Sequence, residues 1–75
     1  MKISDLQDKN IINITDGKNI GKIRDLEIDE QGRIINFYVL PKRFFFSFFI
    51  SNKENIFTIN DIKKIGEDVI LVELN

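Results

Sequence analysis

The sequence contains no cysteine, no histidine and no alanine among its 75 residues, and only one proline. Without cysteine it has no disulfide, no thiolate metal ligand and no thiol nucleophile. Without histidine it lacks the commonest general base and the commonest metal ligand. The three serines, Ser4, Ser47 and Ser51, therefore have no histidine to activate them. We expect a protein that is not an enzyme and has no cofactor, metal or small-molecule substrate.

Blocks of one charge and long apolar runs are also missing. Eleven Lys and Arg residues against twelve Asp and Glu residues give a net charge of −1, and the signs alternate along the chain. This pattern lacks the basic patch of a nucleic-acid-binding surface. No run reaches the ~18 apolar residues of a membrane-spanning helix, and the first residues lack the apolar segment of a signal peptide. We expect a single cytoplasmic domain over residues 1–75, with its core over about 3–74.

Isoleucine is the residue that dominates the composition, with fifteen copies. Because β-branched side chains fit a pleated sheet better than a helix, this usage favours strands. The expected strands are residues 9–14, 22–29, 33–40, 56–59 and 69–74, separated by turns. We predict an all-β fold, a small and highly twisted barrel of five to six strands, because closure removes exposed sheet edges.

A short helical turn is expected near each end of the chain. Ser4 and Gln7 have the spacing of a capping box for a turn over 3–7. Asn60 is placed to cap a second turn over 61–65, which Gly66 would close.

The alternation of apolar residues predicts a bulge in the second strand. Ile23 and the pair Leu26 and Ile28 have opposite parity, so they do not share a face in a regular strand. One extra residue near Arg24 and Asp25 would restore the phase and bend the strand.

Two strands are apolar on both faces. In 33–40, one face carries Ile35, Phe37 and Val39, and the other carries Ile34, Tyr38 and Leu40. The strand 69–74 has the same two-faced character. Since a small barrel has one interior, the second face of each strand needs a cover.

Residues 42–55 form a connection that is rich in phenylalanine and begins with Lys42 and Arg43. Five phenyl rings could bury on the order of 750 Å², more than a monomer usually exposes in one patch. We favour burial of these rings against the chain itself or in a homodimer; insertion into a membrane surface ranks second, and stacking on nucleic acid third. The predicted interaction surface comprises Tyr38, Leu40, Phe44, Phe45, Phe46, Phe48, Phe49 and Ile50.

Two segments resemble ligand-binding motifs only in part. The first segment contains Asp25, Glu27 and Asp29, whose spacing differs from the ligand spacing of a calcium-binding loop. Alternate residues of a strand point to one face, so we expect these three carboxylates to form a solvated acidic stripe. The segment 16–21 has two glycines at the wrong spacing for a phosphate-binding loop, and turn formation explains both.

The order of these features resembles a known family. Residues 59–73, together with Ser4-Asp5-Leu6, the Asp16-Gly17 turn and Leu26-Glu27-Ile28-Asp29 before Gly32, are similar to the sporulation-associated PRC-barrel proteins of low-GC Gram-positive bacteria, the YlmC/YmxH type. The chain differs at Asn60, where that family usually carries Trp, and in residues 42–55, where it lacks the family's glycines. The resemblance implies a docking module with no catalytic residues.

We therefore predict a non-catalytic protein-interaction or adaptor module, and the resemblance implies a connection with sporulation. Self-association as a homodimer is expected, and the other protein partner is unknown. The alternative is a peripheral membrane-surface module that uses the Phe-rich connection. Docking to RNA or the ribosome ranks third.

Overall fold

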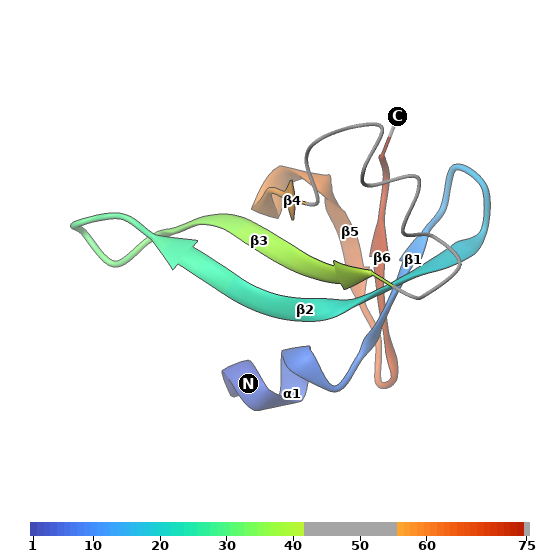
Figure 1. Ribbon diagram of the computed structural model, residues 1–75, viewed down its shortest axis with the longest axis horizontal. Helices are drawn as coiled ribbons and strands as arrows, with labels where there is room; N and C mark the ends of the chain where they lie inside the picture. The colour runs from blue at the N-terminus through green and yellow to red at the C-terminus, as the bar shows by residue number, and fades with distance from the viewer. Residues whose placement is uncertain (42–55, 75) are drawn as a thin grey trace.

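The computed structural model describes residues 1–41 and 56–74, which form one short α-helix, a 3-10 turn and six strands (Figure 1). In chain order these are α1 (Ile3–Gln7), β1 (Asn10–Asn13), β2 (Lys18–Ile28), β3 (Ile34–Pro41), β4 (Ile56–Phe57), η2 (Ile59–Asp61), β5 (Ile62–Ile65) and β6 (Val69–Val72). The predicted all-β class is confirmed. No helix in the described part of the chain is long and apolar enough to cross a membrane.

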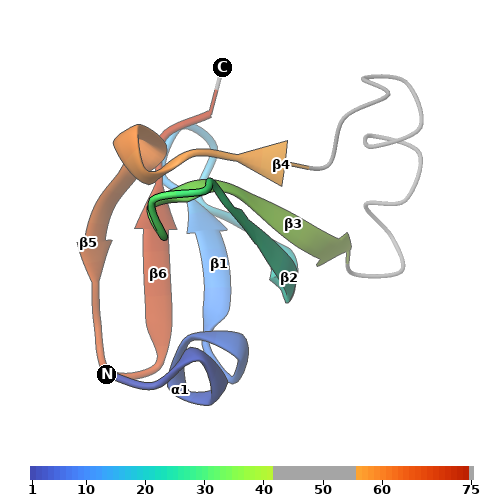
Figure 2. The same ribbon diagram turned by 90° about the vertical axis from the view of Figure 1, so that its left-hand side faces the viewer.

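The six strands form one sheet in the order β4-β3-β2-β1-β6-β5. Neighbouring strands are antiparallel except β1 and β6, which are parallel. The sheet curves around a common interior (Figure 2), but within the described residues no hydrogen-bonded ladder joins its edge strands, β4 and β5. The described residues therefore form a curved sheet whose two edges are linked through η2, and closure into a barrel stays a prediction.

The interior of this curved sheet is apolar. Phe37 of β3 and Phe57 of β4 stack in parallel, with ring centroids 5.1 Å apart. This contact anchors β4, which pairs with β3 at only two positions. In the part of the chain that the structure describes, the buried hydrophobic residues are Ile11, Ile20, Ile23, Phe37, Val39, Phe57, Ile70 and Val72.

Bulges bend β2 along its length. The pairing with β3 shifts between Ile23 and Asp25, so the predicted bulge is confirmed. The β1–β2 pairing contains a further shift, opposite Ile11 and Ile12. Where β2 bends, Gly21 has φ +135°, and a Cβ atom there would overlap the Leu40 carbonyl oxygen. A side chain at position 21 is therefore incompatible with the close approach of β2 to β3.

The second helical turn differs from its prediction. Residues 62–65 form the edge strand β5, and the turn is a 3-10 helix over the preceding Ile59–Asp61. Asp61 accepts a hydrogen bond from the Thr58 backbone N–H (2.9 Å), so the cap involves Thr58 and not Asn60. The Gly66 N–H donates to the Val69 carbonyl (2.7 Å) in the β5–β6 turn and does not close a helix.

The short helix α1 is present, but its predicted capping box is wrong. The Lys2 N–H donates to the Asp5 carboxylate (2.9 Å). Gln7 instead donates its side-chain amide to the Arg24 carbonyl (3.3 Å), which ties α1 to β2.

The last strand is shorter than expected, since β6 ends at Val72. The Leu74 N–H donates to the buried side chain of Asn13 at 3.1 Å, and the Leu74 side chain packs against the core. Leu74 is thus held against β1 without extending the ladder.

Candidate interaction surface

The outer face of β2 and β3 carries the two predicted surface residues that the structure describes. Phe37 and Val39 are buried, so the alternate β3 residues Asn36, Tyr38 and Leu40 point away from the core. In register with these three lie Glu27, Asp25 and Lys22 of β2. We call the set Lys22, Arg24, Asp25, Glu27, Asn36, Tyr38 and Leu40 the β2–β3 outer face.

Tyr38 is the centre of a polar network on this face. Its hydroxyl donates to Glu27 Oε1 (3.1 Å), and the Asn36 side-chain amide donates to the same oxygen (2.9 Å). The Arg24 guanidinium lies 6.0 Å from the centroid of the Tyr38 ring. The hydrogen bond to Glu27, followed by the negative charge of that residue, raises the pKa of Tyr38 above its usual value. The network thus fixes the Tyr38 hydroxyl on the outer face, where the side chain is partly buried.

Leu40 lies near the end of β3 and is 57% exposed. The structure describes β3 up to Pro41 and resumes at Ile56, which pairs with Tyr38. The Phe-rich connection therefore leaves and re-enters the sheet beside the two predicted surface residues. The remaining members of the predicted surface, Phe44, Phe45, Phe46, Phe48, Phe49 and Ile50, lie outside the described residues.

A second apolar surface lies on the outer side of β1 and β6. Ile12 of β1 is in register with Leu71 of β6, and both are partly buried. Val69 is also partly buried, while Ile70 and Val72 face the core. The two-faced character predicted for this strand is confirmed.

The prediction for β3 needs one correction. Strand alternation places Ile35 on the inner face with Phe37, but Ile35 is 42% exposed and Ile34 packs against the core instead. The cause is a shift in the β2–β3 register between Glu27 and Ile28, which reverses the parity at the tip of the hairpin.

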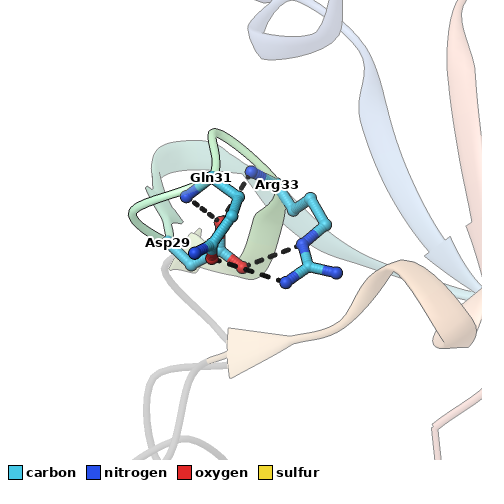
Figure 3. A network of polar contacts seen from close by, with 3 residues as sticks. All are labelled: Asp29, Gln31 and Arg33. Atoms are coloured by element: carbon cyan, nitrogen blue, oxygen red, sulfur yellow. Dashed lines mark hydrogen bonds and ion pairs between the residues drawn. The ribbon is translucent and has the colours of Figure 1, made fainter.

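Asp29 belongs to a turn and not to an acidic surface stripe (Figure 3). Its carboxylate accepts hydrogen bonds from the backbone N–H groups of Gln31 and Arg33, both at 2.9 Å. It also forms an ion pair with the Arg33 guanidinium at 3.1 Å. These contacts, above all the Arg33 backbone hydrogen bond, lower the pKa of Asp29. Of the three predicted stripe residues, only Asp25 and Glu27 lie on the β2–β3 outer face.

The glycine-containing segment 16–21 is only partly a turn, because its residues 18–21 begin β2. Turn formation therefore explains Gly17, whereas Gly21 lies in β2 at the register shift with β1. Asp16 accepts a hydrogen bond from the Lys18 N–H (3.0 Å), and Gly17 adopts φ +74°. Within residues 1–41 and 56–74, no group of three or more acidic side chains is arranged to hold a metal ion.

Sequence reasoning missed the roles of Arg24 and Glu27 on this surface. Glu27 contacts Tyr38 because β2 and β3 pair in one particular register, which strand alternation alone does not specify. The available signal was the charge order along β2, where two cations precede two anions.

Comparison with known proteins identifies a family and a relative. The PRC-barrel domain family model matches residues 1–75. A protein of Bacillus subtilis strain 168 named "Probable sporulation protein YlmC" is 36% identical over 76 aligned positions, which cover all of this chain and 94% of that protein. Both matches include the strands that form the β2–β3 outer face.

Proposed function

Because this chain belongs to the PRC-barrel domain family, we propose that it is a non-catalytic, cytoplasmic protein-interaction module that forms a homodimer. The observation that carries the proposal is the position of Tyr38 and Leu40. They lie on the outside of a sheet whose inner face is already filled by the core, beside both ends of the Phe-rich connection. The interaction surface would combine these two residues with Phe44–Ile50.

The size of the chain supports self-association. A domain of this length buries only roughly 60% of the surface of its unfolded chain, so its own core provides limited stability. Contact with a second copy would remove additional apolar surface from water. A homodimer thereby offers a cover for the second apolar face of β3.

A connection with sporulation is part of the proposal. It is supported by the relative in Bacillus subtilis, whose name describes a probable sporulation protein. Closure of the sheet into a full barrel is also proposed, and the short link from β4 through η2 to β5 supports it.

Light scattering tests the homodimer. We expect the wild-type chain to have twice its 8.8 kDa mass at micromolar concentration. The double variant Phe45→Ser with Phe48→Ser should be monomeric because two rings of the proposed surface are lost. Ile59→Ser, which changes an exposed apolar residue outside this surface, is the matched control and should remain dimeric. A monomeric wild-type protein would refute the homodimer.

A peripheral membrane-surface module is the second candidate. The observation in its favour is the sequence Lys42-Arg43 directly before the phenylalanines, since cations contact anionic headgroups while aromatic rings enter the acyl boundary. It predicts co-sedimentation with phosphatidylglycerol vesicles that is lost in Phe45→Ser with Phe48→Ser. Unchanged binding by that variant, or no binding by the wild type, would exclude this function.

An RNA- or ribosome-associated docking module is the third candidate, and its support is the family resemblance alone. It predicts RNA binding that weakens steeply with salt, because phosphate contacts release counterions.

A further inference from the structure

The β2–β3 outer face has its charges arranged in two blocks. Lys22 and Arg24 are positive and lie toward the middle of β2, whereas Asp25 and Glu27 are negative and lie toward the hairpin tip. All four residues are exposed. Within the described residues the ion pairs are Arg33 with Asp29 and Lys63 with Glu73, so none of the four is neutralised by a salt bridge of its own.

The β-bulge brings both blocks onto one face. In a regular strand, Arg24 and Asp25 would point to opposite sides. The register shift between Ile23 and Asp25 removes this alternation, and the Arg24 guanidinium lies over the Tyr38 ring on the outer face. The sequence of charges on this face is therefore two positive residues followed by two negative ones.

Tyr38 lies at the boundary between the two blocks. It is in register with Asp25, while Leu40 is in register with Lys22 at the positive end and Asn36 with Glu27 at the negative end. A second copy can face the first if a half-turn relates them about an axis that lies between the two faces and crosses the strands at Tyr38. The β2 strands of the two copies are then antiparallel, and each positive end lies against a negative end. This arrangement would also place the two Tyr38 rings together, and aromatic pairs stabilise contacts beyond the area they bury.

We propose that the β2–β3 outer face pairs with the same face of a second copy, so that Lys22 and Arg24 of each chain lie against Glu27 and Asp25 of the other. This inference rests on the proposed homodimer and identifies its contact surface. A twofold interface uses one surface patch on both subunits, so that patch must be complementary to itself. The charge order of β2 meets this requirement, because the opposite orientation would set like charges together.

The interface should be reversible and sensitive to salt. Stable interfaces bury about 800 Å² on each partner, and a face of seven side chains on two strands falls below this area unless the Phe-rich connection contributes to it. Its charges are exposed to solvent, where ions screen them over about 10 Å at 0.1 M salt. We expect the dimer to weaken as the salt concentration rises.

Charge reversal tests the pairing. In Lys22→Glu, the new carboxylate of each copy would face Glu27 of the other copy, and this repulsion occurs twice in the dimer. In Glu27→Lys, the new ammonium group would face Lys22 in the same way. We expect each variant alone to self-associate at least about tenfold more weakly than wild type.

An equimolar mixture of the two variants provides the decisive measurement. In the mixed dimer, the carboxylate introduced at position 22 of one chain would meet the ammonium group introduced at position 27 of the other. The native Lys22 of the second chain would meet the native Glu27 of the first. We expect the mixture to recover wild-type association by sedimentation velocity, which also shows that both variants are folded. Because Glu27 accepts hydrogen bonds from Tyr38 and Asn36, a second pair of variants leaves Glu27 unchanged. Asp25→Lys mixed with Arg24→Glu should give the same result, because these two positions face each other in the proposed dimer.

Three outcomes would overturn the inference. If wild type and both single variants form equally stable dimers, this face is not the interface, although the proposed homodimer stands. If the single variants are monomeric and the mixture is also monomeric, the charge pairing is wrong. If wild type is monomeric, both the interface and the homodimer fail.

Discussion

Tyr38 reports directly on the candidate surface because it is the single tyrosine and the chain has no tryptophan. Its hydroxyl donates to the Glu27 carboxylate, which raises the pKa of Tyr38. We predict that Glu27→Ala lowers this pKa toward 10.0, the usual value for tyrosine. Ultraviolet titration of tyrosinate measures it, with Glu30→Ala as a control of the same charge change. An unchanged Tyr38 pKa in Glu27→Ala would contradict the network.

The same shift implies a dependence of stability on pH. The folded-state pKa of Tyr38 is raised, so the associated stabilisation is complete below the unfolded value of 10.0 and is lost as pH rises through the folded value. Wild type should therefore lose stability more steeply than Glu27→Ala in alkaline solution.

Asp29 has the opposite dependence. Its folded-state pKa is lowered, so its contribution is present above the unfolded value of 3.8 and is lost as pH falls through the folded value. We predict that Asp29→Asn melts at a lower temperature than wild type at neutral pH, because Asn keeps the shape but not the charge that pairs with Arg33. Since Asn resembles protonated Asp, the difference should disappear in strong acid. A difference that persists there would show that the carboxylate charge is not its cause.

Gly21 and Gly32 form a matched pair of backbone positions. Both have positive φ, but a Cβ at position 21 would overlap the Leu40 carbonyl, whereas position 32 has open space around it. We predict that Gly32→Ala costs about 1 kcal/mol of unfolding free energy because alanine disfavours positive φ. Gly21→Ala should cost at least about 3 kcal/mol because the backbones of β2 and β3 must separate. Equal costs in urea denaturation would contradict the close approach.

Among the strands, β4 depends most on a single side chain. It has two residues, and Phe57 stacks on Phe37 in the core. We predict that Phe57→Ala lowers the unfolding free energy by about 3–5 kcal/mol, whereas Ile59→Ala, at an exposed position nearby, changes it by less than about 1 kcal/mol. Urea denaturation at one fixed protein concentration measures both. A small effect of Phe57→Ala would mean that β4 is held by other contacts.

Strand alternation predicts a local structure correctly where the pattern of apolar residues fits only one arrangement. Ile23 and Leu26 belong on the same face, and a bulge is the simplest way to place them there, so this prediction was confirmed. Alternation with Phe37 and Val39 likewise places Tyr38 and Leu40 on the outside.

The edge strand β5 shows why other elements were missed. Ile62 and Ile65 are three residues apart, which fits one side of a helical turn but also fits a strand with a bulge. The structure has a strand with a bulge here, because the β5–β6 pairing shifts register between Ile62 and Lys64. Pairing with β6 decides the outcome, and a local pattern does not contain that information. For the same reason, the hydrogen bond between Tyr38 and Glu27 was not predicted, since it depends on the register of two strands.

The chain as a whole combines a small apolar core with an outer sheet face that carries both apolar and charged residues. Among residues 1–41 and 56–74, eight buried hydrophobic side chains fill the interior, while Tyr38, Leu40 and the charge blocks of β2 remain outside. Stability of a domain is typically about 0.05–0.15 kcal/mol per residue, so a short chain gains substantially from association. Dimer formation also makes the measured stability depend on protein concentration.

Sedimentation equilibrium of the wild-type protein over a range of micromolar concentrations, at low and high salt, tests the proposed homodimer most directly. We predict a mass of twice 8.8 kDa at the higher concentrations, with a shift toward the single-chain mass on dilution and on addition of salt. A mass of 8.8 kDa under all of these conditions would contradict the homodimer.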